Sequence, residues 1–199
     1  KLPGAPQSLQ VDGYEAVRDG RTVYINAANI DGSTFYTNIN VISYNQQAEN
    51  ATIDIFGQIL TQWKFNTNIT SPGLCSKTTA KSCLDNRDCP ADEYCTSGKA
   101  KIVRDTKRLA DLADIKSALE SYKAKNGFYP KLASGSYLPN TTVSAWPSWQ
   151  QTLAKDSAIA LPIDPVNRLG SCAGYDPATC WDEKTKKFFD PTPSDGNFN

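Results

Sequence analysis

The sequence predicts an α+β fold, and three observations support this prediction. Between residues 11 and 44, short runs alternate apolar and polar side chains around Asp-Gly dipeptides, which is typical of an antiparallel meander. Lys99–Asn126 repeats apolar residues every three or four positions, which indicates a long helix. Six cysteines lie where large apolar residues are scarce, so crosslinks are expected to replace a core there.

The N-terminal part is expected to hold three strands. Val11–Arg18 is the first, and the dipeptide Asp19-Gly20 then favours a hairpin turn. Arg21–Asn29 alternates in the manner of a half-buried strand. A second turn at Asp31-Gly32 leads into Thr34–Tyr44. The residues ahead of the first strand show no periodicity and are expected to form an irregular lead-in.

A helix is expected from Gln46 to Phe65, because one of its faces is apolar. That face consists of Ile53, Phe56, Leu60 and Trp63. The stronger helix signal, Lys99–Asn126, has a stripe made of Leu109, Leu112, Ile115, Leu119 and Tyr122. Asn126-Gly127 predicts its end, which Pro130 supports. Both stripes are interpreted as core packing, and the two helices are expected to share one core.

The C-terminal region is expected to contain only small elements. These are a short helix over Ser148–Lys155 and strand character in Trp181–Phe189. The expected organisation is a β-meander plus helix (1–66), a cysteine-rich disulfide-stapled insert (67–98), and a long helix with a C-terminal loop and β region (99–199).

The cysteines favour disulfides over a zinc site. Four of them lie within 21 residues, and the other two enclose a short loop; the six are Cys75, Cys83, Cys89, Cys95, Cys172 and Cys180. A four-cysteine zinc site is usually built from CxxC pairs, and the sequence contains none. Disulfides indicate an extracellular or cell-surface location. The first four cysteines allow three connectivities, of which Cys75 with Cys89 and Cys83 with Cys95 is favoured.

Composition excludes several function classes. The chain lacks histidine, so Ser-His-Asp and Cys-His sites and His-ligated metals are excluded. Its 21 basic and 21 acidic residues give no broad basic surface for nucleic acid. No apolar run is long enough to span a bilayer. The chain has no methionine, which favours a piece excised from a longer precursor.

No motif with a catalytic mechanism is present, so we expect a non-enzymatic protein that requires no cofactor. Trp146, Trp149 and Trp181 are candidate sugar-stacking side chains, with packing as the alternative interpretation. Asn68 and Asn140 begin sequons in expected loops and are candidate glycosylation sites. Residues 101–131 carry eight basic and four acidic residues, a surplus interpreted as a solvated helix face rather than an anion-binding site.

The helix and its end resemble a known family. Asp111-Leu112, Ala118-Leu119-Glu120, Tyr122 and the end Asn126-Gly127-Phe128-Tyr129-Pro130 are similar to the soluble helix of type IV pilin-like proteins, above all the major pseudopilin of type II secretion. Leu161–Asn167 and the Cys172–Cys180 loop resemble the segments that follow it in that family. The resemblance spans Lys99–Phe189. In pilins an apolar segment precedes this helix, whereas here a cysteine-rich segment does.

This resemblance implies an exported bacterial surface protein. In pseudopilins of this type a C-terminal loop binds Ca²⁺, and the comparable oxygen-bearing residues here are Asp164, Asn167, Asp176 and Asp182. The alternative interpretation is that these residues shape turns. Separately, Cys83–Cys95 resembles the core of whey-acidic-protein-type disulfide modules, which implies protease inhibition as a minor alternative.

The expected function is therefore that of a structural subunit of a cell surface or filament, serving assembly, attachment or adhesion. Its expected partners are further copies or other surface-protein subunits. The alternative is an extracellular module that binds carbohydrate or makes Ca²⁺-dependent contacts. Neither alternative involves nucleic acid or a membrane span.

Overall fold

The computed structural model divides the chain into two compact units, Lys1–Leu109 and Ala110–Asn199. It describes residues 5–31, 34–45, 47–132, 135–137, 141–169, 172, 174–176, 179–182, 184–185 and 187–189, the last range without the side chains of 187 and 188. The boundary between the units lies inside the long helix, whereas the sequence predicted boundaries at 66 and 98. The cysteine-rich segment belongs to the first unit because it packs against the start of that helix.

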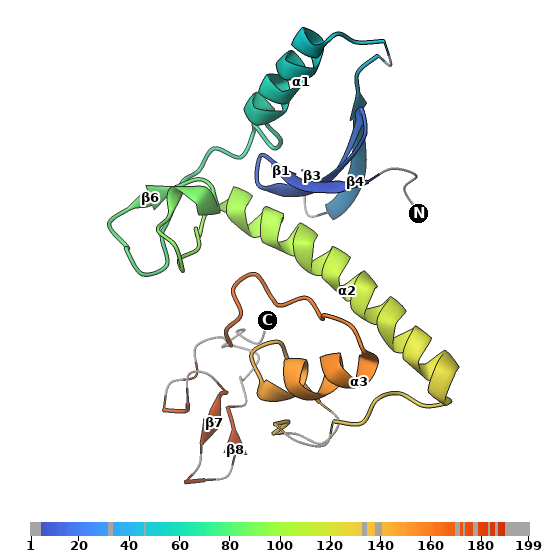
Figure 1. Ribbon diagram of the computed structural model, residues 1–199. Coiled ribbons are helices and arrows are strands. Elements are labelled where there is room, and N and C mark those ends of the chain that lie inside the picture. Colours follow the sequence, from blue (N-terminus) through green and yellow to red (C-terminus); the bar gives the residue numbers. More distant parts are fainter. Residues whose placement is uncertain are drawn as a thin grey trace. The chain divides into compact units, whose positions relative to one another are not determined.

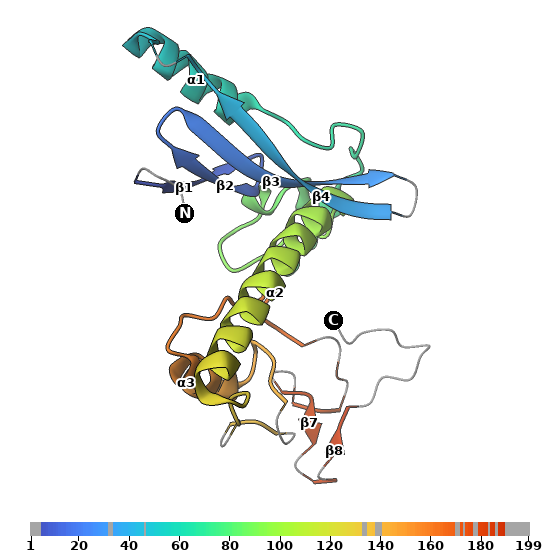
Figure 2. The ribbon, with the colours of Figure 1, turned by 90° about the vertical axis from the view of Figure 1, so that its right-hand side faces the viewer.

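The first unit opens with a four-stranded antiparallel meander, in which each strand pairs with the next (Figures 1 and 2). The strands are β1 (Gln7–Val11), β2 (Tyr14–Asp19), β3 (Thr22–Asp31) and β4 (Thr34–Ser43). The α+β fold class is confirmed.

The prediction of three strands was wrong in one respect. The segment expected to be one strand, Val11–Arg18, is broken by a tight turn at Asp12-Gly13, where both residues have positive φ, 51° and 86°. This turn pairs Val11 with Tyr14, so Gln7–Val11 is a strand of its own that begins within the expected lead-in. Asp-Gly is the same hairpin signal that correctly placed the next turn.

Helix α1 spans Asn50–Gln62 and is therefore shorter than the predicted Gln46–Phe65. Gln46 lies outside the described residues, and the backbone is extended at Glu49 and again at Trp63. Phe56 and Leu60 are buried as predicted, but Trp63 is exposed because it follows the last helical turn.

The core of the first unit lies between one face of the sheet and the helices. Phe56 and Leu60 of α1 belong to the same buried cluster as Val23 and Ile25 of β3. Ile102, from helix α2 (Gly98–Asn126), joins that cluster, which confirms that the two helices share a core.

Small elements build the cysteine-rich segment. They are β5 (Gly73–Leu74), β6 (Ser82–Cys83) and the 3₁₀ turn η1 (Asn86–Asp88). β5 and β6 form a two-stranded antiparallel ladder, and Cys75 pairs with Cys95 in an isolated bridge. The segment's own buried residues are mostly half-cystines, so disulfides replace an apolar core as predicted.

Helix α2 begins and ends almost where the sequence predicts. Gly127 follows it with φ of +81° and donates its N–H to the carbonyl of Lys123 over 2.7 Å, which is a glycine stop. Its burial differs from the prediction. The fully buried residues lie in its N-terminal third, whereas Leu109 and Leu112 of the predicted stripe are exposed.

In the second unit, Ile115 and Leu119 of α2 pack on a cluster formed by Leu153, Ala154 and Leu161. The predicted helix Ser148–Lys155 is a π-helical turn, η2 (Trp149–Ala154), that continues into α3 (Lys155–Ser157). β7 (Trp181–Asp182) and β8 (Lys187–Phe188) confirm the predicted strand character after Cys180.

Candidate functional site

All six cysteines are joined in three disulfides, which confirms the prediction. The favoured pairing of Cys75 with Cys89 and of Cys83 with Cys95 is the one found. These two bonds interleave along the chain, so each closes a loop that contains one end of the other. The third bond joins Cys172 to Cys180.

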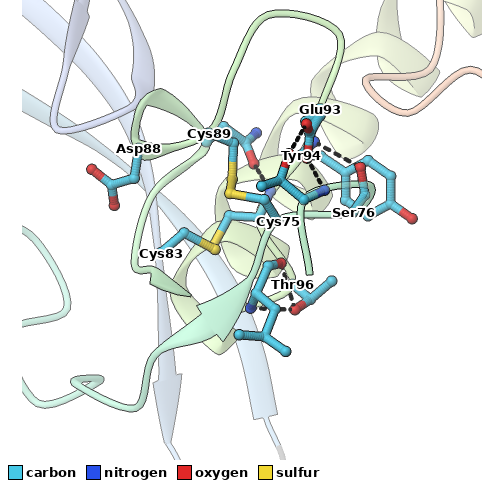
Figure 3. The surroundings of a disulfide bond; sticks show 12 residues. Cys75, Ser76, Cys83, Asp88, Cys89, Glu93, Tyr94 and Thr96 are labelled. Atoms are coloured by element: carbon cyan, nitrogen blue, oxygen red, sulfur yellow. Dashed lines mark hydrogen bonds between the residues drawn. A yellow bond between two sulfur atoms is a disulfide. The ribbon is translucent and has the colours of Figure 1, made fainter. Parts of the chain in front are cut away.

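The interleaved disulfides bring three sulfur atoms together. Those of Cys75, Cys83 and Cys89 lie within 4.8 Å of one another, the only such group of potential metal ligands in the part of the chain that is described. Figure 3 shows the sulfur of Cys83 beside the Cys75–Cys89 bond. Because each sulfur is already bonded to another, the group has no thiolate to offer a metal.

Glu93 fastens the loop after Cys75. Its carboxylate accepts hydrogen bonds from the N–H groups of Lys77 and Thr78, at 3.0 and 2.8 Å, and from the Thr78 hydroxyl at 2.6 Å. The hydroxyl bond, with the backbone bonds, lowers the pKa of Glu93 below its usual value. These hydrogen bonds of the Glu93 carboxylate stabilise the conformation of the loop.

The acidic residues of η1 have a similar local role. Asp85 accepts hydrogen bonds from the backbone N–H of Arg87 and from its guanidinium, at 2.8 to 3.0 Å. Burial opposes the charged form of Asp85, but these bonds outweigh it and lower its pKa. Asp88 accepts the N–H groups of Leu84 and Asp85, which completes a capping box.

Arg104 fixes the cysteine-rich segment to α2. Its buried guanidinium donates from Nη1 to the side-chain oxygen of Asn86 at 3.0 Å and to the carbonyl of Cys95 at 2.8 Å. The same guanidinium lies 5.2 Å from the centre of the Tyr94 ring, within the range of a cation–π contact. Sequence reasoning counted this arginine among solvated helix charges.

Asp12 is a second buried polar centre that sequence reasoning missed. Its carboxylate lies 2.6 Å from the Lys99 ammonium and 3.2 Å from that of Lys64, and accepts the N–H of Phe65 at 2.8 Å. Asp12 and Lys99 are both at least 95% buried. This cluster therefore ties the first hairpin turn to the end of α1 and the start of α2. The Asp12-Gly13 dipeptide could have located the turn, but not its partners.

Tyr14 extends this polar centre. Its hydroxyl donates to the side-chain oxygen of Asn66 at 2.5 Å, and the Asn66 amide donates to the carbonyl of Ala28 at 3.0 Å. Burial, together with the nearby charge of Asp12, raises the pKa of Tyr14 well above its usual value. The phenol is therefore a neutral hydrogen-bond donor and not a base.

Two sets of apolar side chains face outward in the first unit. Ile39 and Val41 of β4 are 63% and 59% exposed. Ile55, Ile59 and Trp63 lie four residues apart along and just after α1, and all three are exposed. Exposed apolar side chains that cluster in this way mark interaction surfaces more often than scattered ones do.

The three tryptophans differ in accessibility. Trp146 is buried in a cluster with Leu169 and the Cys172–Cys180 bond. Trp149 is half-buried, and its indole N–H donates to the carbonyl of Pro162 at 2.8 Å. Trp181 is half-buried and stacks on the exposed Tyr137, with ring centres 6.3 Å apart. The structure therefore does not present the three indoles as one binding surface.

The three aspartates among the candidate calcium ligands each shape a turn, and the fourth candidate, Asn167, lies in the turn of Asp164. Asp164 accepts the N–H groups of Val166 and Asn167, Asp176 accepts that of Thr179, and Asp182 accepts the N–H of Lys184 and the hydroxyl of Thr185. The Thr185 hydroxyl, with the backbone bonds, lowers the pKa of Asp182. Within the described residues these carboxylates are not gathered into one metal-binding group. Their arrangement favours the turn-shaping interpretation.

Of the two candidate glycosylation sites, Asn68 lies exposed in a turn. Asn140 lies outside the described residues. In the described part of the chain, no helix combines the length and apolarity needed to cross a bilayer.

Comparison of the chain with protein-family models, curated proteins and solved structures finds no match.

Proposed function

We propose that this chain is a non-enzymatic extracellular structural protein, a pilin-like subunit of a cell surface or filament that serves assembly, attachment or adhesion. The observation that carries the proposal is that every cysteine is disulfide-bonded, with both compact units crosslinked. Disulfides persist in oxidising compartments and replace an apolar core in small extracellular units.

The polar clusters support a structural role. The buried charges of Asp12, Lys99 and Arg104 connect separate segments of the first unit. The carboxylates of Asp85, Glu93 and Asp182 hold backbone N–H groups of their own turns. These side chains already have bonding partners within the fold, which is the arrangement expected of a scaffold. The helix that ends in Asn126-Gly127-Phe128-Tyr129-Pro130 supports the pilin-like part of the proposal.

Imaging of cells that produce the protein tests this proposal. Immunogold electron microscopy with antibodies against the folded chain should label filaments or the outer surface of intact cells. Labelling only after permeabilisation, or thiols that react in the native protein inside the cell, would contradict it.

A carbohydrate-binding module is the second candidate, and one observation favours it. Tyr137 is exposed and stacks on Trp181, so an aromatic face is present in the second unit. Aromatic faces pack well on the apolar faces of sugars. A glycan array with the native chain and with Tyr137→Ala tests it, and Tyr129→Ala, at another exposed tyrosine, is the matched control. Binding that Tyr137→Ala leaves intact would exclude this site.

A further inference from the structure

Among the described residues, the strand β4 forms an open edge of the sheet, with no strand on its outer side. It is the outermost strand of the order β1-β2-β3-β4, and Figure 2 shows it along one margin. It is ten residues long and pairs with β3 over its whole length without a bulge. It contains no charged residue and no proline. Natural edge strands usually carry such features because they prevent pairing with another strand.

The unpaired backbone groups of β4 belong to its odd-numbered residues. Tyr44 donates its N–H to Arg21, so position 44 is bonded towards β3. The carbonyl of Ala28, which lies opposite Thr37, accepts from Asn66 and so points away from β4. Because bonded and non-bonded pairs alternate in an antiparallel ladder, the odd residues turn their N–H and C=O groups to the open edge. These residues are Phe35, Thr37, Ile39, Val41 and Ser43.

This set of outward-facing residues is symmetric about Ile39, which favours a second copy of the same strand as the partner at the open edge. We propose that β4 pairs with β4 of a second copy of this chain, antiparallel and two-fold symmetric about Ile39. Ile39 then faces Ile39 of the second copy, Thr37 faces Val41, and Phe35 faces Ser43. In this register every outward residue meets an outward residue, and no group at the edge is left without a partner.

Length and charge distinguish this pairing from one with the other edge of the sheet. β1 has five residues, so a β4–β1 contact would leave half of β4 unpaired. Two β4 strands match in length, and neither carries a charge that would repel the other. Ile39 and Val41, exposed in one copy, lie on the same side of the strand. Across the two-fold axis they meet the same side of the second copy, where cross-strand apolar pairs stabilise a sheet.

A second copy paired at β4 would be a partner in assembly, so the biological relevance of the pairing rests on the proposed function. Experiments can contradict the pairing and the proposed function independently. A dimer in solution from a protein that is never at the cell surface would leave the pairing in place and remove the role. A surface-exposed protein that stays monomeric would do the opposite.

Sedimentation equilibrium and hydrogen exchange on the purified chain test the pairing, from micromolar concentrations to about 1 mM. We expect a dimer at high concentration, with amide protection rising at residues 35, 37, 39, 41 and 43. The even-numbered amides should stay unchanged, because β3 already holds them.

Ile39→Lys places two ammonium groups opposite each other and should raise the dimer dissociation constant at least about tenfold. Ile55→Lys replaces a similarly exposed isoleucine, on α1, and should leave it unchanged. The intact disulfides and the circular dichroism of both variants verify folding. A monomer throughout the range, protection of β4 independent of concentration, or a dimer lost in Ile55→Lys but kept in Ile39→Lys would overturn the proposal.

Discussion

The ammonium of Lys99 lies 2.6 Å from the carboxylate of Asp12, although 87 residues separate them along the chain. Both side chains are buried, so their charges depend on each other for solvation. The contact connects the first turn of the meander to the first turn of α2. The cysteine-rich segment lies between these two turns in the sequence.

Lys99→Met tests this contact, because it keeps the length of the side chain and removes its charge. The buried Asp12 carboxylate then keeps only two partly exposed cations, the Lys64 ammonium at 3.2 Å and the Arg87 guanidinium at 3.8 Å. We expect the free energy of unfolding in urea to fall by about 3 kcal/mol. Lys64→Met removes the more exposed ammonium group that pairs with the same carboxylate. It should lower the free energy of unfolding by less than about 1 kcal/mol. Equal losses in the two variants would contradict the assignment.

Arg104→Lys tests the attachment of the cysteine-rich segment to α2. A lysine ammonium cannot reproduce the planar guanidinium that bonds Asn86 and Cys95 and stacks on Tyr94. The expected loss is about 2 kcal/mol of unfolding free energy, because buried acceptors lose their donor. Arg108→Lys, at a surface ion pair with Asp105 on the same helix, is the control and should change stability by less than about 0.5 kcal/mol. A negligible effect of Arg104→Lys would show that the disulfides alone hold the segment.

Replacement of glycine by alanine is expected to have opposite effects on stability at Gly73 and Gly57. A Cβ at Gly73 would lie 2.1 Å from the backbone nitrogen of Ser97, so Gly73→Ala must push two backbone segments apart. We expect it to destabilise the protein by about 2 kcal/mol. A Cβ at Gly57, inside α1, meets nothing within 4 Å, and Gly57→Ala should stabilise the protein by about 0.5–1 kcal/mol. Thermal unfolding of the two variants measures both signs, and a shift of the same sign in both would refute the close approach.

Glu93 predicts a pH dependence of stability. Its folded pKa lies below the ordinary value of 4.5, because Thr78 bonds the charged form. The stabilisation that the charged Glu93 carboxylate gives the folded protein is fully present above the unfolded pKa and is lost as pH falls through the folded pKa. The native chain should thus exceed Glu93→Gln in stability at neutral pH, and the difference should shrink below about pH 4.5. Thr78→Val should weaken the same dependence. Calorimetry between pH 3 and 7 measures it, and a difference that grows towards acid pH would have the wrong sign.

The disulfide pairing predicts the peptides of a non-reducing digest. Linked fragments should join residue 75 to 89, 83 to 95 and 172 to 180. Removing one bond with Cys83→Ser and Cys95→Ser should cost about 3 kcal/mol, because it frees a loop in the unfolded chain. Mass spectrometry of the digest decides the pairing, and a fragment linking residue 75 to 83 would contradict it.

Local sequence signals located most elements of the fold. Asp19-Gly20 and the alternating run that follows placed the β2–β3 hairpin, and Asn126-Gly127 placed the end of α2. The same logic applied to Asp12-Gly13 would have found the first hairpin. These signals work because turns and helix ends depend on the conformational preferences of a few adjacent residues.

The burial of the N-terminal third of α2 could not be found in this way. Its apolar stripe predicted burial around Leu109 and Leu112, which are exposed, while Lys99 and Arg104 are buried. A periodicity shows which residues share a face of a helix, but not whether another element covers that face. Burial of a charged side chain also requires a specific partner, and those partners lie 87 and 9 residues away.

The sequence by itself determined the α+β class, the long helix with its glycine stop, and the use of disulfides in place of a core. Each follows from residue types and spacings that act over a few positions. Only the tertiary structure decided that Asp12 and Lys99 share one buried ion pair and that Trp146 is buried. Only the tertiary structure, too, leaves β4 as an open edge. These features depend on which distant segments come together, and the free energy of burying a charge, an indole or a strand edge is set by those neighbours.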